Sequence, residues 1–204
     1  LRLRVGGVRH DAGEVHDLLA RREEQLAAMT EVELKRRAMG RSNRRNGEIL
    51  EGMILAACAD YREMGRAQID KTPEPMRIIR PYDRRAGQFV AVFAKKAQPD
   101  FKGVLKGGRM IVFDAKHTDS DRVQYSAITD EQRVCLDHCA AMGAEAGVLV
   151  SFGFARCYMI PWAIWRGMKK QYGRKYMLED EAGIYEVKMQ SGRVYFLDAK
   201  EGKR

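Results

Sequence analysis

The chain of 204 residues contains 45% apolar residues, which is ordinary for a globular protein, and it is long enough for one domain with its own hydrophobic core. No apolar run approaches the length of a membrane span, and Leu1–Arg9 lacks the apolar core of a signal peptide, so the sequence predicts a cytoplasmic protein. Lysine and arginine number 37 against 28 acidic residues, and the resulting net charge of +9 favours a polyanionic partner. Nucleic acid is the first candidate, because no lipidation signal or strongly amphipathic basic helix supports an anionic membrane.

The first segment, residues 14–39, is charged and helix-prone, and Thr30–Glu33 resembles a capping box that would restart the helix. We therefore predict an N-terminal helical extension over residues 1–42, packed on the body or on a partner subunit. Its basic end suits either a phosphate contact or a solvated face. Asn46 and Gly47 are expected to start the next helix, within a main domain of residues 43–204.

Glu51 lies on the apolar side of that helix, since Ile54 and Cys58 occupy the next helical positions on the same side. A carboxylate on an apolar face needs a partner, and a metal ion could supply one. The sequence leaves open whether Glu51 is a metal ligand or lies at the edge of the buried stripe.

Residues 67–70 form a short strand candidate, and the prolines of Lys71–Pro75 then interrupt regular structure. Residues 76–96 alternate basic and apolar side chains, with six cations against one acid. This pattern predicts an extended basic excursion that contacts phosphates and stacks on exposed bases. The DNA-contacting residues expected in it are Arg77, Arg80, Tyr82, Arg84, Arg85, Phe89, Lys95 and Lys96.

The stretch from Gln98 to Lys116 predicts a hairpin. Two adjacent glycines within Lys106–Arg109 indicate a tight turn, and the apolar residues on both sides indicate paired strands. Such a hairpin brings Asp100 and Asp114 together, with Lys116 on the face of Asp114 because side chains alternate along a strand. Carboxylates at this density suit a hard cation such as Mg²⁺ or Mn²⁺.

Pro99-Asp100 followed by Asp114-Ala115-Lys116 resembles the PD-(D/E)xK nuclease signature. The match by itself has low specificity, because the same spelling arises by chance in many chains. A solvated hairpin with ordinary surface charge is the alternative interpretation.

Beyond the hairpin, Thr129–Gln132 indicates a helix start, residues 146–154 and 156–160 indicate strands, and Pro161 precedes a further helix. Lys169–Lys175 is basic, and residues 194–197 are a last strand candidate. Cys135, His138 and Cys139 share a helix face that could hold a metal. A fourth ligand is not evident, so buried thiols are the favoured interpretation.

The order of these segments resembles that of RecU-type Holliday junction resolvases over roughly residues 43–200. Lys71–Pro75, the basic excursion, Gln98–Gly103, Phe113–Thr118 and the helix of Gln132 follow in the family's order. The resemblance implies an α/β fold with a restriction-endonuclease-like core, a mixed central β-sheet flanked by helices, and a projecting basic stalk at about residues 75–96.

The resemblance also implies functional roles. Asp100, Asp114 and Lys116 fall on the catalytic positions, Glu51 on the helix acid and Gln132 on a glutamine beside the site. Asp100, Asp114, the Ala115 carbonyl and Glu51 would hold one or two Mg²⁺ ions, with Mn²⁺ as a possible substitute. Cations of the hairpin itself are also expected to bind DNA, namely Lys102, Lys106 and Arg109.

The implied activity is metal-dependent, symmetric nicking of four-way DNA junctions by a homodimer in recombination and repair, in a cytoplasmic, nucleoid-associated protein. Two departures from the family pattern are Asp114, where the family usually has Glu, and Pro99, where it has a hydroxyl residue. Three alternatives remain. They are a PD-(D/E)xK nuclease with another DNA target, a non-catalytic DNA-binding module, and a scaffold that does not bind nucleic acid.

Overall fold

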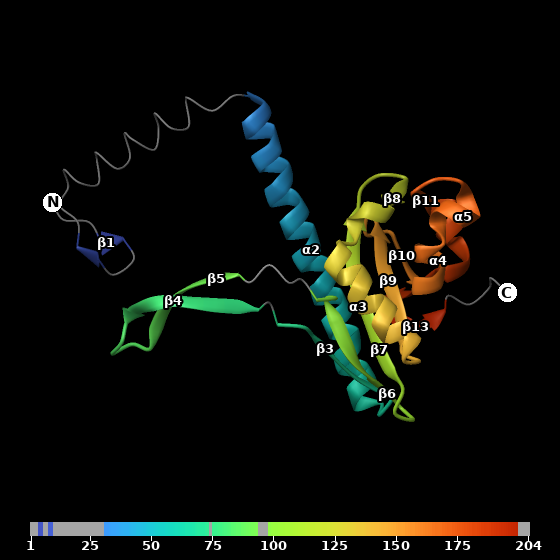
Figure 1. Cartoon of the computed structure of the whole chain (residues 1–204), viewed down its shortest axis with the longest axis horizontal. Coiled ribbons are helices and arrows are strands. Elements are labelled where there is room, and N and C mark those ends of the chain that lie inside the picture. The colour runs from blue at the N-terminus through green and yellow to red at the C-terminus, as the bar shows by residue number, and fades with distance from the viewer. Residues whose placement is uncertain (1–3, 6–7, 10–30, 74, 94–97, 200–204) are drawn as a thin grey trace. The chain divides into compact units, whose positions relative to one another are not determined.

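The computed structural model describes residues 4–5, 8–9, 31–73, 75–93 and 98–199, coloured along the chain in Figure 1. The chain comprises two units, residues 1–44 and 45–204. In the first unit, β1 (Arg4–Val5) pairs antiparallel with β2 (Val8–Arg9). The predicted helix over residues 14–30, together with Lys95 and Lys96, lies outside the described residues.

Helix α2 (Glu31–Glu63) is continuous for 33 residues. The prediction that a new helix starts at Asn46 and Gly47 is therefore wrong. A single glycine within a helix costs only about 1 kcal/mol relative to alanine. Packing of the next turns, where Leu50 and Ile54 are almost completely buried, supplies stabilisation that a local sequence signal does not contain.

The core is a five-stranded mixed sheet in the order β10-β9-β7-β6-β3. Its strands are β3 (Ala67–Lys71), β6 (Phe101–Leu105), β7 (Met110–Thr118), β9 (Glu145–Phe152) and β10 (Arg156–Pro161). Strands β7 and β9 run parallel, and every other neighbouring pair is antiparallel. A parallel pair requires a crossover connection, which here contains α3 (Asp130–Ala141).

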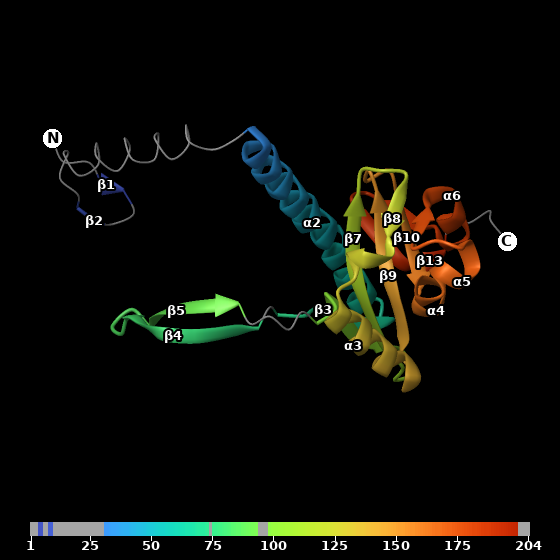
Figure 2. The same cartoon turned by 45° about the horizontal axis from the view of Figure 1, so that its top comes forward.

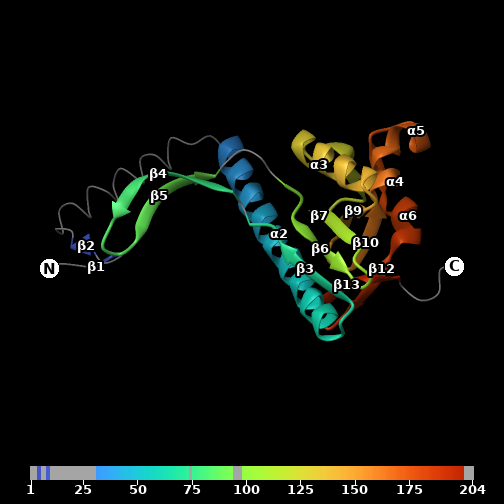
Figure 3. The ribbon, with the colours of Figure 1, turned by 60° about the horizontal axis from the view of Figure 1, so that its bottom comes forward.

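Helices cover both faces of this sheet, as Figures 2 and 3 show. On one face, Leu50, Ile54 and Tyr61 of α2 pack in a cluster with Phe101 and Phe113. On the other face, α3 and α4 (Trp162–Arg166) cover Val112, Val148 and Val150. The predicted fold class, a mixed sheet flanked by helices in an α/β core, is confirmed.

A separate hairpin is inserted between β3 and β6. Its strands, β4 (Met76–Asp83) and β5 (Gln88–Phe93), pair antiparallel with each other and with no strand of the core sheet. All eight residues of β4 are exposed. The excursion predicted from the sequence is thus extended, and it does not contribute to the core. We call residues 76–93 the inserted hairpin.

Smaller elements complete the C-terminal part. Strand β8 (Arg122–Gln124) pairs with β11 (Tyr176–Leu178), and β12 (Val187–Gln190) pairs with β13 (Arg193–Ala199). The short helices are η1 (Tyr125–Ala127), α5 (Met168–Tyr172), α6 (Glu179–Ala182) and η2 (Gly183–Tyr185). Among the described helices, none is both long and apolar enough to cross a membrane.

Candidate active site

The β6–β7 hairpin is built as its sequence predicts. Gly107 and Gly108 both have positive φ, 96° and 89°, and Leu105 donates its N–H to the Arg109 carbonyl at 2.8 Å. Phe101 pairs with Phe113 in the antiparallel register, so Asp100 and Asp114 are neighbours at the next position along the two strands. The hairpin thereby brings together two carboxylates that lie 14 positions apart in the sequence.

Asp114 is completely buried. Its Oδ1 accepts a hydrogen bond from Gln132 Nε2 at 2.5 Å, and its Oδ2 forms an ion pair with Lys116 Nζ. Burial raises the pKa of this carboxyl to about 7; the Lys116 ammonium opposes the rise, and Asp100 adds to it. Burial therefore disfavours the isolated Asp114 carboxylate, and a neighbouring cation stabilises it.

Asp100 is half-buried and is fixed through both its side chain and its backbone. Its Oδ2 accepts the N–H of Ala115 at 3.0 Å, and its carbonyl accepts the N–H of Thr72 at 2.7 Å. The first bond ties Asp100 to the strand that carries Asp114. The second ties it to the segment that follows β3.

Gln132 connects helix α3 to the carboxylate cluster. Its Oε1 accepts the Thr129 N–H at 3.0 Å, while its own N–H donates to Thr129 Oγ1 at 3.3 Å. This reciprocal capping box fixes the first turn of the helix. The same amide group then has Nε2 available for Asp114, so the start of α3 and the buried acid are positioned together.

Glu51 does not join these groups. Its Oε2 accepts a hydrogen bond from Lys71 Nζ at 2.6 Å. The alternation of β7 explains the separation, because Phe113 faces the cluster beneath α2 while Asp114 contacts α3. The structure thus brings together Asp100, Asp114, Lys116 and Gln132, and leaves Glu51 paired with a cation.

The donors that are present fit a hard divalent cation. Within the described residues, no three or more acidic, histidine or cysteine side chains form a metal-binding group. Two neighbouring carboxylates, Asp100 and Asp114, remain as oxygen donors. Mg²⁺ commonly keeps several waters and is bound through one or two carboxylates, so this donor set is compatible with it.

The cations predicted to bind DNA are exposed wherever they are described. Arg77, Arg80, Arg84 and Arg85 lie on the inserted hairpin, as do the exposed rings of Tyr82 and Phe89. On the β6–β7 hairpin, Lys106 is also exposed. Lys102 donates to Gln98 Oε1 at 3.2 Å, and Arg109 pairs with Glu145 at 2.7 Å.

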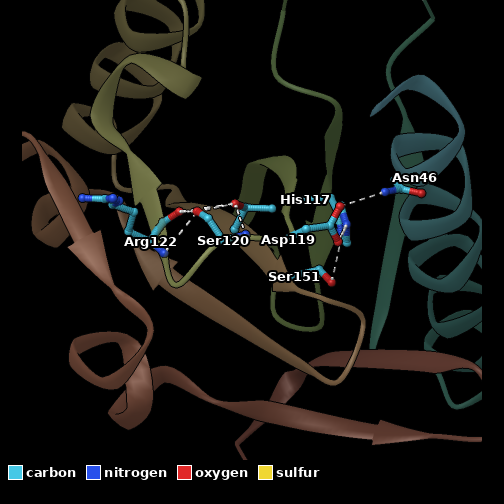
Figure 4. A network of polar contacts seen from close by, with 7 residues as sticks. Asn46, His117, Asp119, Ser120, Arg122 and Ser151 are labelled. Atoms are coloured by element: carbon cyan, nitrogen blue, oxygen red, sulfur yellow. Dashed lines mark hydrogen bonds and ion pairs between the residues drawn. The ribbon is translucent and has the colours of Figure 1, made fainter. Parts of the chain in front are cut away.

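His117, which the sequence analysis did not single out, is the centre of a polar network beside the site (Figure 4). Its ring nitrogens lie 3.4 Å from Ser151 Oγ and 2.9 Å from Asp119 Oδ1, and Phe154 stacks on the ring at 4.0 Å between centroids. Asp119 in turn accepts a 3.5 Å contact from Asn46 of α2. The sequence does indicate where this side chain lies. His117 directly follows Lys116, so the alternation of side chains along a strand places it on the opposite face of β7.

The cysteines behave as buried thiols except for Cys135, which is half-buried. Burial raises the pKa of Cys58 to about 12 and that of Cys157 to about 11. Cys135, His138 and Cys139 line one side of a groove of about 690 Å³ between α3 and the β6–β7 hairpin.

The fold and the cluster define a class of protein. A mixed sheet whose central hairpin carries Asp100, Asp114 and Lys116, flanked by helices on both faces, is the core of restriction-endonuclease-like proteins. The chain belongs to the RecU family, described as recombination protein U, whose pattern matches residues 45–201.

No curated protein matches the chain. A solved structure of Hjc from Archaeoglobus fulgidus, described as a Holliday junction resolvase from an archaeal hyperthermophile, is similar at 12% identity. The similarity covers 71% of this chain and 92% of that chain, with a TM-score of 0.43.

Proposed function

We propose that the protein is a structure-selective endonuclease that resolves four-way DNA junctions by metal-dependent nicking. The observation that carries this proposal is the cluster of Asp100, buried Asp114, Lys116 and Gln132 within the region that matches the RecU family. Its place of action would be the cytoplasm, at the nucleoid, in recombination and repair.

The metal would be Mg²⁺, with Mn²⁺ as a substitute, held by Asp100, Asp114 and the Ala115 carbonyl. Glu51 could contribute only through water or after leaving Lys71, with which it is paired at 2.6 Å. When bound, the metal supplies a Lewis acid that lowers the pKa of a water molecule and neutralises charge on the scissile phosphate.

The remaining steps belong to the side chains. Lys116 is one-quarter exposed, so its ammonium can reach both the site and solvent, and it is suited to orient the attacking water and stabilise developing negative charge. Gln132 fixes one oxygen of Asp114, and the Ala115 N–H fixes one oxygen of Asp100. Such prior positioning lowers the cost of assembling the site around the phosphate.

Junction selectivity is assigned to the inserted hairpin. Its cations are exposed, as are the rings of Tyr82 and Phe89, 68% and 54% exposed. Large apolar side chains on a two-stranded hairpin can bury little of one another's surface, so we expect a partner surface to cover them. Unstacked bases and converging phosphates at the centre of an open junction supply such a surface.

We propose further that the active form is a homodimer. A four-way junction has near two-fold symmetry, and a C2 dimer with one site in each subunit could nick two strands symmetrically.

The test is cleavage of a labelled synthetic four-way junction, compared with a linear duplex of the same sequence, with and without Mg²⁺. Asp100→Asn should abolish cleavage while leaving junction binding equal or tighter, because the substitution removes repulsion toward phosphate. The matched control is Glu63→Gln, which removes an exposed carboxylate at the end of α2, outside the cluster.

Each alternative function has its own outcome. Equal cutting of junction and linear duplex would indicate a nuclease with another target. Junction binding without cleavage under any divalent metal would indicate a non-catalytic module. Equal loss of binding and cleavage in Asp100→Asn would assign Asp100 a folding role and overturn the site.

A further inference from the structure

A second concentration of positive charge lies far along the chain from the inserted hairpin. Residues 166–175 contain five cations and no acidic residue, so this short segment contributes +5 to a net charge of +9. It contains all of α5 and the turn that leads to β11. Neither the fold nor the proposed cleavage chemistry requires this excess.

The two arginines of the segment have structural roles. Arg166 pairs with Asp137 at 3.2 Å, and Arg174 binds both oxygens of Glu181 at 2.6 and 2.7 Å. The lysines differ from them. Lys169, Lys170 and Lys175 are all exposed, and none forms an ion pair with any other residue in the described part of the chain. We call these three residues the α5 lysines.

The backbone fixes the positions of these lysines. Helix α5 ends at Tyr172, and Gly173 adopts the left-handed conformation, with φ of 70°, that turns the chain out of the helix. The Lys175 carbonyl then accepts the N–H of Tyr125 at 2.9 Å. A surface held in this way presents its charges with little loss of backbone entropy on binding.

Nearby acids do little to neutralise the surface. Glu179 is engaged by Tyr158 and Arg156, and Glu181 by Arg174. Asp180 is the exposed acid that remains in this stretch. The α5 lysines therefore outnumber the free acidic charge beside them, and a polyanion is the complementary partner.

The type of contact follows from the neighbouring rings. Arg174 lies over the rings of both Tyr172 and Tyr176, at 5.5 and 4.6 Å from their centroids, and Arg122 also lies over Tyr176. Rings covered in this way are poor platforms for bases. Lysine is a point charge without the planar fork that reads base edges, so contact with the phosphate backbone is favoured over base recognition.

Topology separates this surface from the inserted hairpin. The hairpin joins β3 to β6 at one edge of the core sheet, whereas α4 and α5 follow β10 at the other edge (Figure 1). A polyanion that contacts the α5 lysines as well as the site must extend across the sheet. Duplex DNA, with charged phosphates at regular intervals along its length, meets this requirement.

We propose that the α5 lysines bind the phosphate backbone of a duplex arm that leaves the junction, as a sequence-independent contact separate from the active site. The proposal rests on the proposed function, in which the substrate is branched DNA. It adds a second contact surface, whose effect depends on the length of the arm.

The test measures junction affinity as a function of salt for the full chain and for the double variant Lys169→Gln/Lys170→Gln. Each lost phosphate contact lowers the slope of log K against log salt by about 0.9, so we expect the slope to fall by up to about 2. Adding Lys175→Gln should lower it by up to about 1 more. The matched control is Arg62→Gln/Lys188→Gln, which removes the same charge from exposed positions elsewhere and should leave the slope close to the parent value.

Arm length supplies a second readout. Shortening the junction arms should lower the junction affinity of the parent and of the control variant but should leave the affinity of the double variant nearly unchanged. Cleavage under saturating, single-turnover conditions should be equal in all three proteins, because the α5 lysines contact neither Asp100 nor Asp114 in the structure. A variant with the parent's salt slope and arm-length dependence would overturn the proposal.

A failure of the proposed function would give a different experimental result from a failure of the lysine contact. If the parent binds junction and linear duplex equally and cuts neither, while the double variant still loses salt slope on the duplex, the lysine contact stands and the resolvase assignment falls. If the variant retains full DNA affinity and instead loses binding to phosphatidylserine vesicles, the partner is a membrane surface and the DNA contact is wrong.

Discussion

Asp114→Asn should stabilise the metal-free protein at pH 8, although it removes a residue of the candidate active site. Asp114 is completely buried, and without a metal its charge is opposed by desolvation and by Asp100. Asparagine has nearly the same shape, and its carbonyl oxygen can still accept the hydrogen bond from Gln132 Nε2. The substitution therefore removes the buried charge and leaves the packing in place.

The magnitude follows from the pKa. A rise from 3.8 to about 7 corresponds to about 4 kcal/mol of preference for the neutral carboxyl group. Asparagine reproduces the neutral carboxyl group imperfectly in this buried site, so we expect a net gain of about 2 kcal/mol at pH 8. For a chain of this size, that gain corresponds to an increase in Tm of about 4–8 °C.

The pH window distinguishes this mechanism from a general packing effect. Below about pH 4, Asp114 is protonated in both the folded and the unfolded protein, so its charge contributes nothing to stability. Between pH 4 and pH 7 only the folded state retains the proton, and the wild-type protein loses stability relative to the variant as pH rises. Above pH 7 both states have released the proton, and the difference should remain constant.

Thermal melts in EDTA at unit pH intervals from 4 to 8 provide the measurement, with Asp180→Asn as the exposed control. Adding Mg²⁺ at pH 8 should raise the Tm of the wild-type protein and have a much smaller effect on Asp114→Asn, because ligand binding stabilises only the state that binds it. A difference in Tm that does not change with pH, or a variant that is less stable throughout, would refute the argument that Asp114 has a raised pKa.

Three further predictions concern the site, the inserted hairpin and the sheet. Lys116→Ala should lower single-turnover cleavage by roughly 10²–10³-fold with metal affinity little changed, and near wild-type turnover would leave Lys116 as an ordinary surface cation. Replacing Met76–Val92 with a Gly/Ser linker should preserve the circular dichroism spectrum and the melt while removing the preference for junctions over duplex and lowering salt sensitivity; a folded variant that still selects junctions would contradict this role. Gly103→Ala should destabilise the protein by several kcal/mol in urea titrations, because the added Cβ would lie 2.1 Å from the Gln68 carbonyl oxygen. Gly52→Ala is the control, since no atom lies near its Cβ, and its free energy of unfolding should rise by up to about 1 kcal/mol. Equal stability of the two variants would show that β3 can move away from β6.

The sequence by itself determined the features that depend on near neighbours. The turn of the β6–β7 hairpin requires positive φ at two successive positions, and Gly107 and Gly108 adopt it readily because they have no Cβ. Alternation along β7 then places Asp114 and Lys116 on one face, where they form an ion pair. Thr129 and Gln132 begin α3 through bonds that span three residues. These features involve short chain segments, so their energies can be judged from the residues concerned.

The tertiary structure alone decided how these pieces meet. The pKa of Asp114 depends on its complete burial, which requires α3 to pack over β7 and Gln132 to reach it from 18 positions away. The pairing of Glu51 with Lys71 follows from the helix packing on the face opposite Asp114, and no local pattern specifies that choice. Helix α2 continues through Gly47 because the packing of later turns outweighs a small local penalty. Desolvation and long-range packing are sums over residues distant in the sequence, and only the folded chain brings those residues into contact.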